Sequence, residues 1–120
     1  MRQSNRVRDD SGSATVLAAA FITVLVAIWI AGIALGSAVI ARHRAQAAAD
    51  LAALAAASRL PAGAAEACRY GGGVAASMGA QVRRCFAERL DITIAVTVPV
   101  GGRLAWQAGA SARAGPVRSG

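Results

Sequence analysis

An uncharged run near the N-terminus limits what this chain can become more than any other feature. The 31 residues from Ser11 to Ala41 carry no charged side chain. As a helix, the part from Ala14 onward would be about 42 Å long at about 1.5 Å per residue, and a bilayer core of about 30 Å needs only about 20 residues. A secretory signal has an apolar core of about 7–15 residues. The run therefore predicts a retained transmembrane helix over residues 13–41.

The charges that flank the run predict its orientation. Three arginines and the amino terminus precede it, against Arg42 and Arg44 just after it. Positive residues favour the cytoplasmic side of a span, and so short a tail is awkward to translocate without a signal. We expect residues 1–12 to be a cytoplasmic leader and the C-terminal part to be extracytoplasmic, in a single-pass protein of the cytoplasmic membrane.

The helical pattern does not stop where the uncharged run ends. Residues 42–60 are rich in alanine, the strongest helix former, and the first helix breakers are Pro61 and Gly63. The sequence predicts one helix from about Ala14 to Leu60. Its residues 42–60 would continue the transmembrane helix outside the membrane.

Two pairs of residues on this helix are candidates for contacts with other chains. Gly32 and Gly36 form a GxxxG pair that would let a second helix approach closely, although glycine is common enough here for the spacing to arise by chance. Gln46 and Asp50 share one polar side of the helix. They are either a solvated face or a docking contact.

The chain after Pro61 predicts a short helix followed by a small sheet. Gly71 to Gly73 interrupt the helical pattern and are expected to form a flexible turn, since the Lys-Ser/Thr of a phosphate-binding loop is missing. From Asp91 to Val100 apolar and polar residues alternate, which is typical of a half-buried strand. Pro99 indicates an edge or a strand terminus. With flanking segments as partner strands, residues 61–120 would form a small α+β domain with an antiparallel sheet.

Cys68 and Cys85 lie on either side of the helix-to-strand transition. In an exported domain they meet an oxidising compartment, so a disulfide is expected. Closing a loop of this size stabilises a domain by about 3 kcal/mol in the chain-entropy model. Two thiols and the distant His43 are too few for a metal site. We expect a disulfide-stapled domain without metal or cofactor.

Composition and residue patterns argue against several classes of function. The net charge is +7 and all 13 basic residues are arginine, spread along the chain, while only five residues are aromatic. The sequence thus has no stacking platform for single-stranded nucleic acid, and we do not expect nucleic acid as a partner. The carboxylates form no recognisable pair and no nucleophile motif is present. We expect neither an enzyme nor a small-molecule substrate.

An ordered set of short segments resembles a known family. The segments are "GSATVL", "HRAQAAADLAALAAA", "EACRY", "GAQVRRC", "LDITIAVTVPV" and "ARAGP", and together they extend from Gly12 to Pro116. They are similar to the TadE/TadG-like proteins of Flp (type IVb) pilus assembly, in the short actinobacterial form encoded near a helicase and secretion genes. The resemblance implies a minor pilin, pseudopilin or accessory protein of pilus assembly or Tad-type secretion. Its partners would be other pilin-like or Tad-system membrane proteins.

The resemblance also implies a processing site. In that family a prepilin peptidase can cut after a glycine, and the mature chain carries Glu at its fifth position. A cut between Gly12 and Ser13 would place Leu17 there. A carboxylate inside lipid is expensive unless it is neutralised, and in pilins a neighbour's N-terminus is thought to do so. With Leu17 in place of the Glu, two roles stay open. The chain is either processed and incorporated into a fibre, or it remains an uncut accessory protein in the membrane.

Two other functions are compatible with the residues alone. A small membrane-active protein of the holin or toxin type needs only short length, basic charge and one span, but this function leaves the cysteines and the alternating strand unexplained. The second alternative is an exported basic module that binds nucleic acid. Its affinity for nucleic acid would decrease steeply as the salt concentration rises.

Overall fold

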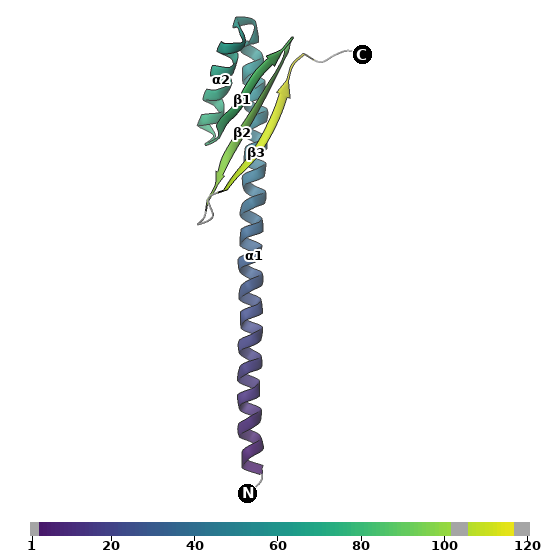
Figure 1. Ribbon diagram of the computed structural model, residues 1–120, viewed down its shortest axis with the longest axis vertical. Coiled ribbons are helices and arrows are strands. Elements are labelled where there is room, and N and C mark those ends of the chain that lie inside the picture. Colours follow the sequence, from purple (N-terminus) through teal and green to yellow (C-terminus); the bar gives the residue numbers. More distant parts are fainter. Residues whose placement is uncertain (1–2, 102–105, 117–120) are drawn as a thin grey trace. The chain divides into compact units, whose positions relative to one another are not determined.

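A computed structural model of the chain describes residues 3–101 and 106–116, with side chains described from Asp10 onward. The elements are α1 (Gln3–Arg59), η1 (Leu60–Ala62), α2 (Ala64–Ser77), β1 (Gln81–Glu88), β2 (Asp91–Val100) and β3 (Trp106–Ala114) (Figure 1). The predicted α+β class is confirmed. The chain divides into two compact units, Met1–Gly36 and Ser37–Gly120.

The N-terminal unit contains the first part of α1 and no other described element. The helix begins at Gln3 rather than near Ala14, because no proline precedes the apolar run to stop it. The large apolar side chains described here, from Val16 to Leu35, are all exposed, from 51 % at Val26 to 73 % at Trp29. The helix is long and apolar enough to cross a membrane. An apolar surface of this kind, without protein covering it, is typical of a segment that lies in lipid.

In the C-terminal unit α1 ends close to the predicted stop. It runs to Arg59 and tightens into η1, which contains Pro61. Gly63 follows with φ of 111°, a conformation that favours glycine, and its N–H donates to the carbonyl oxygen of Leu60 at 3.0 Å. This connection lets α2 run back beside α1 (Figure 1).

The three glycines expected to form a flexible turn lie inside α2, so this prediction was wrong. α2 is continuous from Ala64 to Ser77, and Gly71 is buried where the two helices meet. A Cβ at Gly71 would lie 2.8 Å from the carbonyl oxygen of Ala52, 2.8 Å from Ile94 Cδ1 and 2.9 Å from Ala56 Cβ. Glycine weakens an isolated helix, but here it permits a helix contact that any larger residue would prevent.

The three strands form an antiparallel meander in the order β1-β2-β3, with β2 in the centre. The predicted alternation along β2 is confirmed. Its buried residues are Ile92, Ile94, Val96, Val98 and Val100. β2 therefore carries one apolar face toward the helices, as expected of a half-buried strand.

Two irregularities shape the sheet. The pairing of β1 with β2 shifts between Val82 and Arg84, so Arg83 is the extra residue of a β-bulge. Pro99 pairs with Gln107 of β3 and lies beyond Thr97, where the pairing of β2 with β1 begins. Pro99 thus lies near a strand terminus, as predicted, in a part of β2 with a partner strand on one side.

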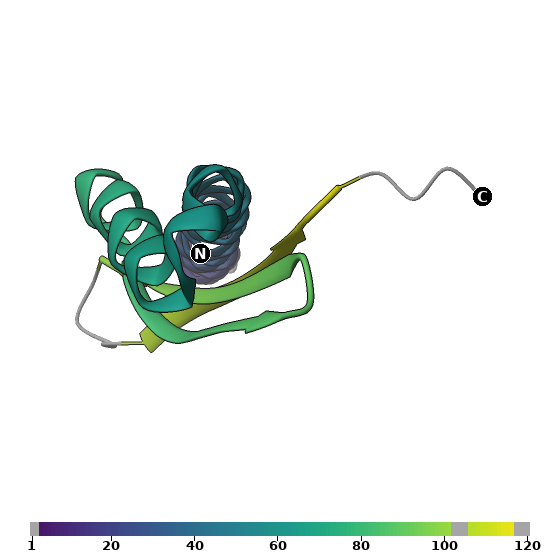
Figure 2. The ribbon, with the colours of Figure 1, turned by 90° about the horizontal axis from the view of Figure 1, so that it is seen from above.

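Alanine forms the helical side of the core. Both helices lie on the same side of the sheet (Figure 2). The buried residues of α1 in this unit are Ala41, Ala45, Ala48, Ala49, Ala52, Ala53 and Ala56. Their spacing of three and four residues places them on one helix face, and their small side chains leave room for the Ile and Val side chains of β2. The core is therefore asymmetric, with methyl groups from the helix and branched side chains from the sheet.

Candidate functional site

A disulfide fastens the second helix to the sheet. Cys68 on α2 and Cys85 on β1 are bonded, with their Cα atoms 5.9 Å apart. Both cysteines are partly buried and pack against the core. The bond joins α2 to β1 and so restrains the connection between these two elements.

The predicted docking residues lie on the solvent side of α1. Gln46 Nε2 donates to Asp50 Oδ1 at 2.9 Å, and both side chains are exposed, as are His43 and Leu54. An i,i+4 bond of this kind supports the helix slightly. It also orients the Asp50 carboxylate away from the alanine face, and a docking role for the pair stays a prediction.

The GxxxG pair forms an open notch in the N-terminal unit. Gly32 and Gly36 are exposed, and a Cβ at either position would meet no atom within 4 Å. A shallow recess of about 330 Å³ lies at Gly32 between Ile28, Trp29 and Ile33. Its shape suits the surface of a second helix, since missing side chains let backbones approach. Helix packing at this notch stays a prediction.

The possible processing site lies on the exposed surface of α1. Gly12 and Ser13 are both exposed helical residues, and Leu17, at the position of the family's Glu, is 60 % exposed. Among the side chains described in the N-terminal unit, from Asp10 to Gly36, none covers Leu17. Cleavage between Gly12 and Ser13 stays a prediction.

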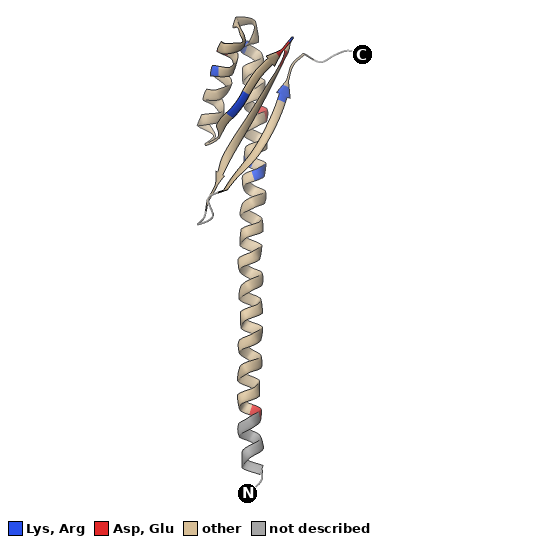
Figure 3. Ribbon diagram, viewed as in Figure 1, with Lys and Arg blue, Asp and Glu red and all other residues tan. Residues whose placement is uncertain are grey.

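Figure 3 shows where the charged residues lie along the ribbon, and some of those in the C-terminal unit form surface pairs. Arg69 Nη2 donates to Glu66 Oε1 at 2.7 Å, and this bond holds the pKa of Glu66 below its usual value while raising that of Arg69. Arg113 Nη2 donates to Asp91 Oδ2 at 2.6 Å and lies 4.0 Å from Glu88 Oε2. These carboxylates serve as partners of arginines on the surface.

The described side chains offer few groups for chemistry. Among residues 10–101 and 106–116, no group of three or more His, Cys, Asp and Glu is placed to hold a metal ion. Arg59 stacks on Tyr70, with its guanidinium carbon 4.6 Å from the ring centroid. Arg83 donates to Thr97 and to Gln107 across the sheet. These contacts join surface side chains within the C-terminal unit.

The sequence reasoning missed two features of α1 and its surroundings. The alanine face was not recognised as the core, although the spacing Ala41, Ala45, Ala48, Ala52 is itself a helical signal. Trp106, at the start of β3, lines the same recess as Arg42 of α1. No local pattern could have indicated that these two residues share a recess, because they are far apart in the chain.

Comparison with known protein families finds a match within α1. A family model described as putative Flp pilus-assembly TadE/G-like matches residues 12–59. Residues 12–59 form a TadE/G-like segment. The predicted resemblance is therefore confirmed over this part, which includes nearly all of the uncharged run and the whole alanine face of α1.

A curated relative and the solved structures complete the comparison. The chain is 55 % identical over 53 residues to a Mycobacterium tuberculosis protein named apoptosis inhibitor Rv3654c. The alignment covers 44 % of this chain and 63 % of that protein, so it spans less than two thirds of the relative's length. No solved structure matches the chain.

Proposed function

We propose that this chain is a membrane-anchored TadE-like component of Flp-type pilus assembly or Tad-type secretion. The observation that carries the proposal is the TadE/G-like match over residues 12–59, all within α1. The same helix is apolar enough to cross a membrane and supplies the alanine side of the C-terminal core. A protein built on such a helix works as an anchor and a scaffold, with other membrane proteins of the system as partners.

The proposal includes a topology with the N-terminus in the cytoplasm and the Cys68–Cys85 domain outside. Leu17 favours an accessory role over incorporation into a fibre, because it lacks the charge that would be neutralised by a neighbouring chain. The notch at Gly32 and the polar pair at Gln46 and Asp50 are the proposed contact points with other pilin-like helices.

Deletion and complementation in the native host test this function. Loss of the gene should abolish surface pili or Tad-dependent secretion, and the wild-type chain should restore them. A variant with Ile22→Arg and Leu25→Arg should not restore them, because each arginine opposes insertion by about 2.5–3.5 kcal/mol at a helix centre. A paired control, Leu51→Arg with Leu54→Arg, changes two exposed leucines of the C-terminal unit and should still insert. Normal pili without the gene would refute the proposal.

Intact mass of the protein from host membranes tests topology and processing together. A full-length chain with an intact disulfide supports an uncut accessory. A chain that begins at Ser13 with the disulfide supports pilin-type processing despite Leu17. Free thiols at Cys68 and Cys85 in native membranes would contradict the proposed orientation, since an extracytoplasmic pair meets an oxidising compartment.

The relative's name gives a second candidate function, inhibition of apoptosis. The 55 % identity over 53 residues is the observation that favours it. The test is expression of the full chain in cultured animal cells treated with an apoptosis inducer, with the Ile22→Arg/Leu25→Arg variant for comparison. Unchanged cell death at equal expression would remove this candidate and leave the assembly proposal intact.

A further inference from the structure

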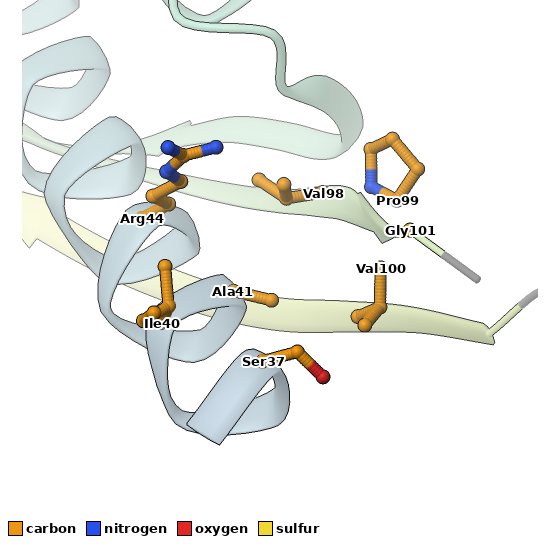
Figure 4. Close-up of a pocket in the computed structure, with 8 residues that line it drawn as sticks. All are labelled: Ser37, Ile40, Ala41, Arg44, Val98, Pro99, Val100 and Gly101. Carbon is orange, nitrogen blue, oxygen red and sulfur yellow. The ribbon is translucent and has the colours of Figure 1, made fainter. Parts of the chain in front are cut away.

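The end of the β2–β3 hairpin lies beside the first turns of α1 in the C-terminal unit. A recess of about 240 Å³ separates Arg44 on α1 from Pro99 at the end of β2 (Figure 4). Another of about 300 Å³ lies between Arg42 on α1 and Trp106 at the start of β3. We call this region the hairpin-end surface, formed by Val39, Ile40, Arg42, Arg44, Pro99 and Trp106.

The apolar side chains of the hairpin-end surface are exposed. The exposed fraction is 55 % for Val39, 57 % for Ile40 and 48 % for Trp106. Val39 and Trp106 line one of the two recesses and Ile40 lines the other, and on α1 both recesses lie where the uncharged run ends, at Ala41. Exposed apolar side chains that cluster on a protein surface often mark a site of contact. Here Val39 and Ile40 belong to the apolar run itself, which indicates a lipid partner.

The charged side chains of the same surface lack an acidic partner. Arg42 and Arg44 are exposed, and within the described part of the chain neither forms an ion pair, whereas Arg69 and Arg113 do. No Asp or Glu lines either recess. The positive charge is therefore available to an anion from outside the chain.

We propose that the hairpin-end surface rests on the bilayer, where Arg42 and Arg44 bind the phosphates of anionic phospholipids and Trp106 lies among the headgroups. This inference rests on the proposed membrane anchoring of α1. Tryptophan prefers the membrane interface because its ring is apolar and its N–H needs a polar partner. Guanidinium groups donate several hydrogen bonds to phosphate oxygens. One partner thus accounts for both the apolar and the charged side chains.

The chain offers a direct measurement because it has two tryptophans, Trp29 and Trp106. The full chain is reconstituted into vesicles of phosphatidylcholine with phosphatidylglycerol, as Trp29→Phe or as Trp106→Phe. Spin-labelled lipids then quench the remaining tryptophan from the headgroup or from the acyl-chain centre. For Trp106 the ratio of headgroup to deep quenching should exceed one, and for Trp29 it should fall below one.

The arginines are tested by the choice between lipids. In the Trp29→Phe background, headgroup-labelled phosphatidylglycerol should quench Trp106 more than labelled phosphatidylcholine does. Arg42→Gln with Arg44→Gln should abolish this difference. A matched control, Arg84→Gln with Arg89→Gln, removes the same charge from β1 and the β1–β2 turn and should preserve it. Equal effects of the two double variants would overturn the assignment of the arginines.

Failure of this inference is distinguishable from failure of the anchoring. If Trp29 is quenched from the acyl-chain centre while Trp106 is quenched by neither label, α1 spans the membrane and the hairpin-end surface does not touch lipid. If Trp29 is quenched by neither label, α1 is not anchored in the membrane. The proposed lipid contact of the hairpin-end surface is then refuted as well.

Discussion

The two units use apolar residues in opposite ways. In the N-terminal unit, large side chains such as Phe21, Ile22 and Trp29 point outward and are more than half exposed. In the C-terminal unit, α1 buries alanines and leaves Leu51 and Leu54 at the surface, 49 % and 63 % exposed. The contrast lies within one helix, so helix formation by itself does not explain it.

The difference reflects what each part of the helix packs against. Large apolar groups at the surface are stable where the surroundings are apolar, as in lipid. Where a sheet supplies the bulk, as β2 does with Ile92, Ile94 and Val96, the helix needs small residues to fit against it. Residue size, rather than hydrophobicity alone, therefore separates the part suited to lipid from the part that folds on itself.

The largest expected effect comes from truncating the sheet side of the core. Ile94→Ala should lower the free energy of unfolding of the C-terminal unit by about 2–5 kcal/mol, because Ile94 is fully buried and a cavity would remain. The measurement is denaturant unfolding of the full chain in detergent, followed by far-ultraviolet circular dichroism. Ile22→Ala removes the same atoms from an exposed site in the N-terminal unit and should leave this transition unchanged. Equal losses of unfolding free energy for Ile94→Ala and Ile22→Ala would contradict the contrast between buried and exposed apolar residues in the two units.

Removal of the disulfide should have the next largest effect. Cys68→Ser with Cys85→Ser should lower the free energy of unfolding by about 3 kcal/mol, since a loop closed across 17 residues no longer restrains the unfolded chain. The same unfolding experiment in oxidising buffer measures it. In reducing buffer the wild type should approach the variant. If the wild type still has the higher free energy of unfolding after complete reduction, the disulfide is not the source of the difference.

Close packing of the two helices predicts a third, smaller effect. Gly71→Ala should destabilise the C-terminal unit by about 1–3 kcal/mol, because the new Cβ would contact Ala52 and Ile94 too closely. Gly73 is exposed, and a Cβ there meets no atom within 4 Å. Gly73→Ala should therefore stabilise α2 by about 0.5–1 kcal/mol. Melting temperatures that shift in the same direction for both variants would argue against a specific contact at Gly71.

The smallest effect is expected from the surface pair on α2. The bond from Arg69 lowers the pKa of Glu66, so the pair stabilises the fold above the unfolded-state pKa of 4.5 and this contribution disappears as the pH falls through the folded-state pKa. Glu66→Gln should therefore be slightly less stable than the wild type near pH 7 and equal to it in acid. The contribution is small because both side chains are exposed to solvent. Melting curves of the two chains across this pH range measure the difference, and a gap that widens in acid would contradict the sign.

Local patterns predicted most of the secondary structure and one half of the core. The charge-free run predicted a membrane-compatible helix, Pro61 and Gly63 marked the end of α1, and the alternation from Ile92 to Val100 gave the buried face of β2. These features depend on backbone propensity and on the period of apolar residues, which a short stretch of sequence contains in full.

Only the tertiary structure decided which residues meet across the chain. Glycine at 71 weakens a helix by itself, and only the approach of Ala52 and Ile94 makes it necessary within α2. Alanine forms helices anywhere, and only the sheet beside it makes one alanine face the core. Trp106 likewise became part of a surface because the hairpin returns to α1 near Arg42. The sequence by itself determined the elements and their apolar periods, whereas the contacts followed from packing in three dimensions, because a side chain's surroundings depend on residues distant along the chain.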